Sequence, residues 1–314
     1  MSINSKLKIF SGTANRCLSE EIARWIGVPL GQAEVTRFSD GEISIYIKES
    51  VRGSNVYLIQ PICPPVNEHM MELLILVDAL KRASSKSVNV VIPYYGYARQ
   101  DRKTRARDPI TAKLVADLIT AAGANRIVAM DLHAGQIQGF FNIPFDHLTA
   151  IPILANFFNS IDIDSGIVVS PDLGGLTRAR QLADRLSLPI AVIDKKRVAP
   201  NKTEIMNVIG TVRNKTAILV DDIIDTAGTI VQGAKELTNQ GVLEIYACCT
   251  HPVFSGPALE RLRGSSIKQV VYTNTIPVCP EIEGEKFKVL SVAPLIGEAI
   301  MRIHEERSVS ELFD

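Results

Sequence analysis

The chain has 314 residues, 46% hydrophobic and 22% charged, which is long enough for two domains with full cores and excludes a disordered or fibrous protein. Lys plus Arg and Asp plus Glu each number 34, so no overall basic field attracts nucleic acid or an anionic membrane, and any anion site must be local. The first ten residues hold no apolar signal-peptide run and no later segment is free of charges over a membrane-spanning length, which predicts a cytoplasmic protein.

The first half of the sequence alternates predicted strands and helices. Residues 35–38 and 43–47 form a predicted hairpin around Asp40-Gly41, because isoleucines at every second position are typical of a half-exposed strand. Helix 66–82 is apolar on more than one side, which places it deep in a core or at a subunit contact. The other predicted elements are strands 8–10, 55–60, 87–93 and 126–131 and helices 19–26 and 110–122.

The second half repeats this alternation. Its predicted helices are 150–159, 177–186, 229–240, 256–263 and 294–306, and its predicted strands are 166–170, 190–194, 218–220, 244–250, 268–273 and 287–291. Strands separated by helices indicate mainly parallel sheets covered on both faces, which is an α/β fold. The halves are similar in length and order, so we expect a duplicated domain with its boundary near residues 146–150: a first domain 1–147 and a second domain 148–302.

The segment 217–229, AILVDDIIDTAGT, has the strongest functional pattern. The strand 218–220 is followed by Asp221 and Asp222 at its carboxyl end, where open α/β sheets bind ligands. The small residues 225–229 let backbone N–H groups converge at the start of a helix, which suits a phosphate. The acidic pair suits sugar hydroxyls or a cation-bridged diphosphate. A lone Asp-Asp would more often be a solvated turn, but the whole run favours an anion site.

The segment 94–107 follows another predicted strand. It places tyrosines beside Arg99, Gln100, Arg102 and Lys103, which together offer a stacking surface for a base and charge for phosphates. Arg105 and Arg107 extend the cluster. A solvated basic loop is the alternative, and the pattern alone leaves both open.

Two more strand ends carry candidate ligands. After strand 166–170, Gly174 and Gly175 permit the close backbone approach that a diphosphate needs, and Asp172 could reach a metal bridging its oxygens; a plain helix start is the alternative. After strand 126–131, His133 is a candidate magnesium or phosphate ligand, although a single His there is more often a packing residue. The five cysteines lack CxxC spacing, so we expect reduced thiols and neither disulfides nor a zinc site.

The segment 195–204, KKRVAPNKTE, is basic and poor in large apolar residues. It fits a mobile lid that brings Lys195 and Arg197 over a reacting phosphate. Without the neighbouring sites, a disordered surface loop would be the simpler interpretation.

The run 221–229 resembles the ribose 5-phosphate loop of phosphoribosyltransferase-fold proteins. Together with 38–42, 94–103, 131–133, 171–175 and 195–197, it makes essentially the whole chain resemble the ribose-phosphate pyrophosphokinase family. The resemblance implies two phosphoribosyltransferase-like domains, with the tail 303–314 returning to the first. It also implies an enzyme of nucleotide biosynthesis that converts ATP and ribose 5-phosphate, with Mg²⁺, into 5-phosphoribosyl 1-diphosphate (PRPP) and AMP.

The resemblance also implies roles for individual residues. Lys195 and Arg197 would be catalytic, Phe38, Asp40 and Glu42 would contact the adenine bound by a neighbouring subunit, and Arg99, Gln100, Asp101 and His133 would contact ATP. His133 and Asp172 would hold Mg²⁺, Asp172, Gly174 and Gly175 would form the diphosphate loop, and Arg197, Asp221, Asp222, Asp225, Thr226, Ala227, Gly228 and Thr229 would bind ribose 5-phosphate. Phosphate activation and ADP inhibition would involve Arg102, Lys103, Arg105, Arg107, Ser308, Ser310 and Phe313.

One departure from the family pattern and two rival functions remain. Leu173 stands where the family often has a smaller or β-branched residue, which we expect to tune the loop without removing the chemistry. A PRPP-consuming phosphoribosyltransferase would need only the loop 221–229, and a non-catalytic scaffolding relative would be expected to lack Lys195 or Arg197. The resemblance further implies a homo-oligomer, with a hexamer expected, and no nucleic-acid or membrane partner.

Overall fold

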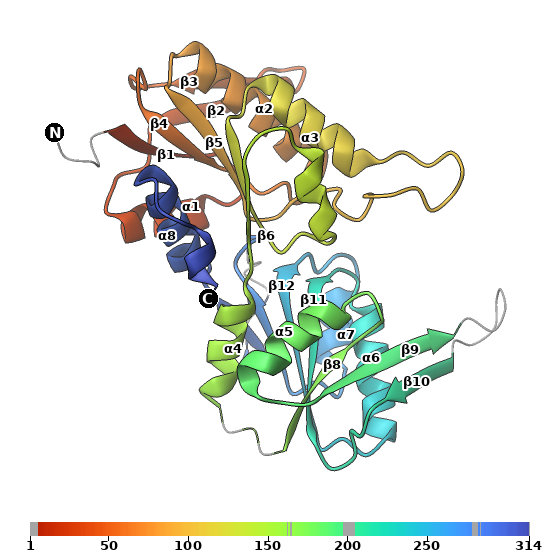
Figure 1. The fold of residues 1–314 in the computed structure, drawn as a ribbon. Coiled ribbons are helices and arrows are strands. Elements are labelled where there is room, and N and C mark those ends of the chain that lie inside the picture. The colour runs from red at the N-terminus through yellow and green to blue at the C-terminus, as the bar shows by residue number, and fades with distance from the viewer. Residues whose placement is uncertain are drawn as a thin grey trace. The chain divides into compact units, whose positions relative to one another are not determined.

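The computed structural model describes residues 6–161, 163, 165–196, 205–277, 282 and 284–313. The chain divides into two compact units (Figure 1). Unit 1 comprises Met1–Thr149, Thr275–Pro277 and Ser291–Asp314, and unit 2 comprises Ala150–Asn274 and Val278–Leu290. The C-terminal segment of unit 1 begins at Ser291 and is therefore longer than the expected tail 303–314. It includes the helix Ala293–His304, which the predicted domain boundary at residue 302 would have divided. Within the described ranges, no helix is both long and apolar enough to cross a bilayer.

Unit 1 is built on a five-stranded parallel sheet of order β1-β4-β5-β6-β7 and a separate antiparallel pair β2–β3. Its strands are β1 (Leu7–Ser11), β2 (Ala33–Arg37), β3 (Ile43–Ile47), β4 (Asn55–Ile59), β5 (Ser87–Ile92), β6 (Arg126–Met130) and β7 (Phe145–Leu148). Its helices are α1 (Arg16–Ile26), α2 (Val66–Arg82), α3 (Thr111–Ala122), α8 (Ala293–His304) and the short 3-10 helices η2 (Gly135–Phe140) and η3 (Ser310–Leu312).

Unit 2 is built on a seven-stranded sheet of order β10-β9-β8-β11-β12-β13-β14, parallel except for the β9–β10 hairpin. Its strands are β8 (Gly166–Ser170), β9 (Ile190–Lys196), β10 (Ile205–Ile209), β11 (Thr216–Ile224), β12 (Glu244–Pro252), β13 (Gln269–Thr273) and β14 (Phe287–Leu290). Its helices are α4 (Ile151–Asn159), α5 (Leu176–Leu186), α6 (Gly228–Asn239) and α7 (Ala258–Arg263).

The two units repeat one order of elements. The run β1-α1-β2-β3-β4-α2-β5-α3-β6-β7 matches β8-α5-β9-β10-β11-α6-β12-α7-β13-β14, and the sheet orders β1-β4-β5-β6-β7 and β8-β11-β12-β13-β14 match as well. In this correspondence the hairpin β2–β3 is the counterpart of the hairpin β9–β10. The chain is thus an α/β protein made of two similar halves, as the sequence predicted.

The helices that follow the two repeats are exchanged between the units. Helix α4 follows β7 but belongs to unit 2, where it packs on α5, and helix α8 follows β14 but belongs to unit 1, where it packs on α1 (Figure 1). The α1–α8 contact is close: a Cβ on Gly297 would lie 2.5 Å from the ring of Trp25.

The central strand β11 explains why the sheet of unit 2 is buried on both faces. Ala217 and Leu219 pack in one apolar core with α6 and α7, whereas Ile218 and Val220 pack in another with α4 and α5. Since side chains alternate along a strand, a run of apolar residues is required when helices cover both faces. This arrangement carries the candidate loops to one end of the sheet, because they follow the carboxyl ends of the neighbouring parallel strands β8 and β11.

Three strand predictions need correction. The edge strands β7 and β10 were not expected, because β7 mixes polar and apolar residues and β10 lies beyond a basic segment. Strand β11 runs to Ile224 and not to residue 220, because pairing with β12 continues past the apolar core through Asp221, Ile223 and Ile224. The acidic pair therefore lies within the strand and not after it.

Candidate active site

The loop between β11 and α6 has the geometry of an anion site. Ala227 adopts a left-handed conformation (φ 58°) as the residue before helix α6, so it turns the chain sharply into the helix. Its methyl group offers no oxygen to the first N–H groups of the helix, which consequently remain available to an anion at the positive end of the dipole. Thr226 and Thr229 are exposed beside this turn.

A segment after β12 braces this loop. The backbone N–H of Ser255 donates to the carbonyl of Asp225 at 3.0 Å, and its hydroxyl donates to the Asp225 carboxylate. Arg261 on α7 donates through Nη1 to the Thr226 carbonyl at 3.0 Å. Two elements distant in sequence thus fix the loop from outside. Sequence reasoning did not identify Ser255 or Arg261, since neither lies in a recognisable motif.

The two aspartates of β11 differ in environment. Asp222 has a side chain only 4% exposed and lies 3.2 Å from Arg178 Nη1, while Asp221 is 23% exposed and lies 3.6 Å from the same atom. Burial and the Asp222 carboxylate raise the pKa of Asp221 to about 8, although the Arg178 guanidinium opposes this rise. Asp221 is consequently the member of the pair that is open to a ligand, and Asp222 is the buried one.

The loop after β8 lies beside the β11 loop within unit 2. Ser170 Oγ donates to the Asp172 carbonyl at 2.6 Å, and the Gly175 N–H donates to Asp172 Oδ1 at 2.9 Å, so the loop folds around its aspartate. A Cβ on Gly175 would lie 2.9 Å from Ser170 Oγ, a closeness that only glycine tolerates without a shift. Leu173 is 62% exposed.

The predicted lid is described only in part. Lys195 lies in β9, close to its end, and β10 begins again at Ile205, so the two strands form an antiparallel hairpin. The prediction of a loop from 195 onward is therefore corrected for residues 195–196. Arg197 and the rest of the predicted lid to residue 204 lie outside the described residues.

In unit 1, the turn 38–42 connects β2 and β3. Phe38 is 59% exposed, and the turn is closed by the Gly41 N–H donating to the Phe38 carbonyl at 2.9 Å and the Glu42 N–H donating to Asp40 Oδ1 at 3.1 Å. Arg37 pairs with Glu68 on α2 and so ties the hairpin to the rest of the unit. An exposed ring and two carboxylates are thus presented together on one rigid turn.

The loop after β5 presents Arg99 and Gln100 at the surface. Thr111 donates to Gln100 Oε1 at 2.5 Å, and the Ala112 N–H donates to the Gln100 carbonyl at 3.1 Å, which ties this loop to the start of α3. Gln136 on η2 donates to Asp101 Oδ2 at 2.8 Å. This bond joins the loop to the segment that follows β6.

His133 is exposed two residues before η2. The neighbouring Leu132 N–H donates to His147 Nε2 at 2.9 Å, which fixes the backbone as it leaves β6. Among the described residues, no three His, Cys, Asp or Glu side chains gather in a way that could hold a metal ion.

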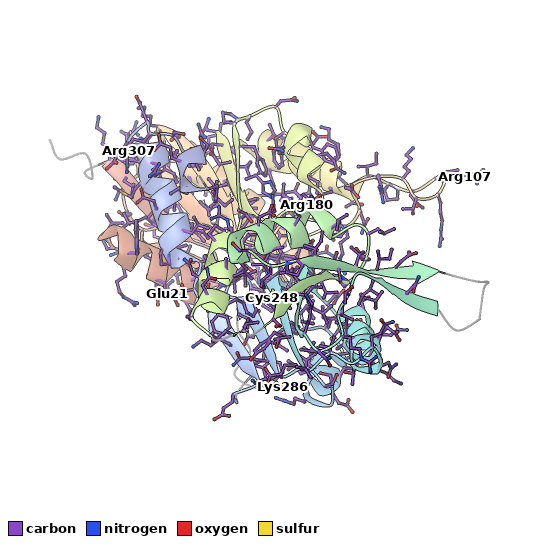
Figure 2. All side chains as sticks on the ribbon, turned by 60° about the horizontal axis from the view of Figure 1, so that its bottom comes forward. Glu21, Arg107, Arg180, Cys248, Lys286 and Arg307 are labelled. Atoms are coloured by element: carbon purple, nitrogen blue, oxygen red, sulfur yellow. The ribbon has the colours of Figure 1, made fainter. Side chains whose placement is uncertain are left out.

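The cationic residues proposed for regulation, Arg102, Lys103, Arg105 and Arg107, are all exposed, and Figure 2 shows Arg107 on an extended loop. Asp108 accepts from the Arg105 N–H at 2.8 Å and from the Thr104 hydroxyl at 2.7 Å, and these bonds lower the pKa of Asp108. The loop is thus organised by a carboxylate at its base.

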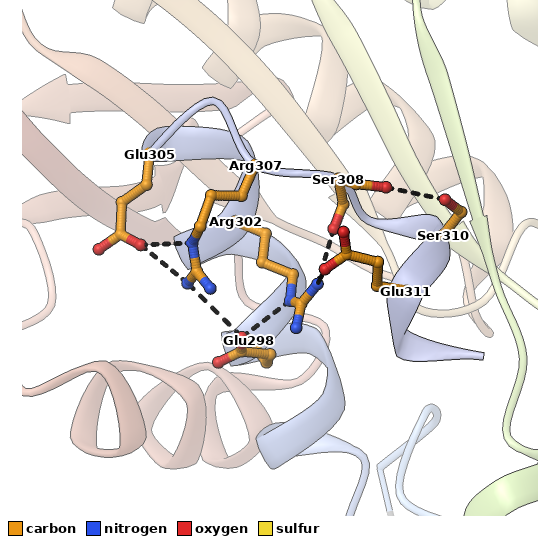
Figure 3. Close-up of polar contacts among 7 residues, drawn as sticks. All are labelled: Glu298, Arg302, Glu305, Arg307, Ser308, Ser310 and Glu311. Atoms are coloured by element: carbon orange, nitrogen blue, oxygen red, sulfur yellow. Dashed lines mark hydrogen bonds and ion pairs between the residues drawn. The ribbon is translucent and has the colours of Figure 1, made fainter. Parts of the chain in front are cut away.

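The C-terminal tail is fastened to α8 by Arg302 (Figure 3). Arg302 Nη1 donates to the Ser308 carbonyl and to Glu311 Oε2, both at 2.8 Å. The hydroxyls of Ser308 and Ser310 lie 2.8 Å apart and are exposed, and Phe313 is partly buried. The tail is therefore held in one defined conformation at its start.

Comparison with known proteins identifies the family. Residues 7–123 match the N-terminal domain of ribose phosphate pyrophosphokinase, and residues 195–314 match the phosphoribosyl synthetase-associated domain. The ribose-phosphate pyrophosphokinase of Oceanobacillus iheyensis is 61% identical over 311 residues, covering 99% of this chain and 98% of that protein. The corresponding Bacillus subtilis protein is 60% identical over 310 residues, with the same coverage.

A solved structure supports the same family assignment. The phosphoribosylpyrophosphate synthetase of Mycobacterium smegmatis superposes with a TM-score of 0.92 at 40% identity, covering 96% of this chain and 100% of that one. The chain therefore belongs to the ribose-phosphate pyrophosphokinase family.

Proposed function

We propose that this chain transfers the diphosphoryl group of ATP to the anomeric hydroxyl of ribose 5-phosphate, giving PRPP and AMP. The single observation that carries the proposal is the geometry of the β11–α6 loop. The open Asp221 side chain precedes this loop, the loop leads into the N-terminus of α6, and Ser255 and Arg261 brace it from outside. The helix N-terminus suits the 5-phosphate, and the Asp221 carboxylate suits the sugar hydroxyls. Membership of the family supports the same reaction.

In the proposed reaction the anomeric oxygen attacks the β-phosphorus in line and the AMP oxygen leaves. Phosphoryl transfer requires positioning and charge stabilisation more than covalent help from the protein. Residues 225–229 would hold the sugar phosphate, residues 172–175 would cradle the diphosphate, and Lys195 with Arg197 would neutralise the charge that develops on the β-phosphoryl oxygens.

The residues proposed for Mg²⁺ and ATP fit these roles chemically. Asp172 and His133 would hold Mg²⁺ together with the ATP phosphates, and the ion would supply countercharge to the phosphate oxygens. Arg99, Gln100 and Asp101 would contact ATP, and the turn 38–42 would reach the adenine bound by a neighbouring subunit. The proposal therefore includes a homo-oligomer, expected to be a hexamer and to act in the cytoplasm, whose size a solution mass measurement would establish.

We also infer that inorganic phosphate activates the enzyme and that ADP inhibits it through residues 102–107 and the tail hydroxyls. The support is the exposed cationic loop 102–107, since such crowding of like charges is unfavourable unless anions neutralise it.

The test is to incubate the full chain with ATP, Mg²⁺ and ribose 5-phosphate and to follow products by phosphorus NMR. AMP and PRPP should appear together in equal amounts, and neither should appear when ribose 5-phosphate is omitted. ADP formation in place of AMP would refute diphosphoryl transfer. Absence of turnover would favour a scaffolding relative, and PRPP consumption with a free base would favour a phosphoribosyltransferase.

A further inference from the structure

Arg178 is a charged residue of unit 2 to which the proposed reaction assigns no role. It lies in the first turn of α5, and its side chain is only 15% exposed. A guanidinium at this depth is stable only when carboxylates or other acceptors compensate for lost hydration. The ion pairs with Asp221 and Asp222 provide that compensation.

The alternation of side chains along β11 explains this geometry. Asp222 shares the strand face of Ile218 and Val220, which pack on α4 and α5, and it is therefore directed to the helix that carries Arg178. Asp221 alternates to the other face, yet its Oδ1 also lies 3.6 Å from Arg178 Nη1. One cation thus faces two adjacent carboxylates.

The position of Arg178 also connects two loops. A Cβ on Gly175 would lie 4.0 Å from Arg178 Nη1, and the Gly175 N–H donates to Asp172. The guanidinium is therefore next to both the loop 172–175 and the acidic pair of β11. In the proposed reaction these segments hold the diphosphate and the sugar that become joined.

We propose that Arg178 is a positioning residue of the sugar site: it holds the Asp221–Asp222 pair so that the Asp221 carboxyl group is directed to the sugar hydroxyls. This inference rests on the proposed function. Asp222 serves as the buried counterion that fixes Arg178, and Asp221 makes the contact with substrate. Loss of the cation removes the group that opposes the rise of the Asp221 pKa, so Asp221 is protonated over a wider pH range and becomes a poorer hydrogen-bond acceptor there.

The two thiols beside the acidic pair do not supply a compensating positive charge. On β12, the strand beside β11, Cys248 and Cys249 are fully buried, and burial raises the pKa of both thiols, so they remain neutral. His251, two residues further along β12, is also buried and is paired in register with Ile223. Arg178 itself forms an ion pair with each of the two aspartates.

The test compares Arg178→Gln, Arg178→Lys and the control Arg180→Gln, which changes an exposed arginine of the same helix (Figure 2). Ribose 5-phosphate binding is measured by calorimetric titration, and steady-state kinetics are recorded, from pH 7 to pH 10. This range lies above the second phosphate pKa of about 6, so the charge of the substrate phosphate stays nearly constant. We expect Arg178→Gln to weaken ribose 5-phosphate binding about tenfold or more at pH 7.5, with a much smaller change in the KM for ATP. The pH at which binding is half-maximal should rise by about one unit or more.

Arg178→Lys and a double variant distinguish a positioning role of Arg178 from a general loss of structure. Arg178→Lys keeps the charge and should recover part of the binding, and Asp222→Asn combined with Arg178→Gln should recover more than Arg178→Gln alone, because one carboxylate then remains without a competitor. The inference would be overturned if Arg178→Gln left the pH dependence of ribose 5-phosphate binding unshifted. It would also be overturned if the KM for ribose 5-phosphate and the KM for ATP rose equally in that variant. If Arg178→Gln fails to fold, Arg178→Lys decides by its geometry: its KM for ribose 5-phosphate should rise more than its KM for ATP, and equal rises, or none in either relative to Arg180→Gln, would overturn the inference. A wild-type chain that neither binds ribose 5-phosphate nor forms PRPP would instead refute the proposed function.

Discussion

Replacing Gly175 by alanine tests whether the loop after β8 depends on close backbone approach. The new Cβ would lie 2.9 Å from Ser170 Oγ and 3.7 Å from Asp172 Oδ1. Ser170 is fully buried and its hydroxyl donates to the Asp172 carbonyl. The methyl group therefore cannot fit unless this hydroxyl or the start of α5 moves.

The expected magnitude follows from that contact. Overpacking of a well-filled site costs about 1–3 kcal/mol, and a disturbed hydrogen bond costs about 1 kcal/mol. Because residues 172–174 are exposed and can relax partly toward solvent, we expect the free energy of unfolding to fall by about 1–2 kcal/mol. The same shift displaces the groups proposed to hold the diphosphate, so kcat/KM for ATP should fall about tenfold or more, while the KM for ribose 5-phosphate changes less.

Urea denaturation and steady-state kinetics measure these two effects. For the unfolding measurement, Gly174→Ala is the matched control, because its Cβ would meet only the flexible Asp172 carboxylate, at 3.3 Å. Adding Ser170→Ala to Gly175→Ala removes the clashing oxygen and should recover stability beyond simple additivity. Wild-type stability and kcat/KM in Gly175→Ala, or strictly additive losses in the double variant, would refute the reasoning.

Four other changes test the remaining proposals. Lys195→Ala should lower kcat about a hundredfold or more, equivalent to roughly 3 kcal/mol, with ribose 5-phosphate binding retained in calorimetry; an unchanged kcat would remove Lys195 from the mechanism. Asp225→Ala should raise the KM for ribose 5-phosphate far more than that for ATP, and equal increases would show that the loop is not the sugar site. Arg105→Ala with Arg107→Ala should weaken phosphate activation and the ADP inhibition that is not competitive with ATP, while kcat at saturating ATP persists; intact responses would place regulation elsewhere. Arg302→Ala removes the bonds to Ser308 and Glu311, so hydrogen exchange in residues 308–312 should accelerate, and unchanged exchange would show that other contacts hold the tail.

The elements with strong periodicity were predictable from sequence, and the edges were not. The buried strands around β11 are continuous apolar runs because helices cover both faces, and this pattern is visible without a structure. Strands β7 and β10 lie at sheet edges, where each pairs with a single neighbouring strand and its composition is mixed. The exchange of α4 and α8 between units was also invisible, since amphipathic helices do not encode which surface they cover.

The candidate site shows the same division. The loop residues 225–229 could be recognised because backbone convergence requires small residues in a fixed order. Arg178, Ser255 and Arg261 could not, because each acts through tertiary contacts to that loop from elements distant in sequence. Asp221 and Asp222 also differ in burial, and this difference cannot be predicted from two identical adjacent residues in the sequence.

The exchanged helices determine the order in which the protein can be completed during synthesis. Unit 2 has all its residues once Leu290 has been translated, whereas unit 1 still lacks α8 at that point. Until α8 arrives, the surface of α1 around Trp25 has no cover from it. Domains usually finish folding in the order in which they leave the ribosome. In this chain the unit that is translated first is the last one to be complete.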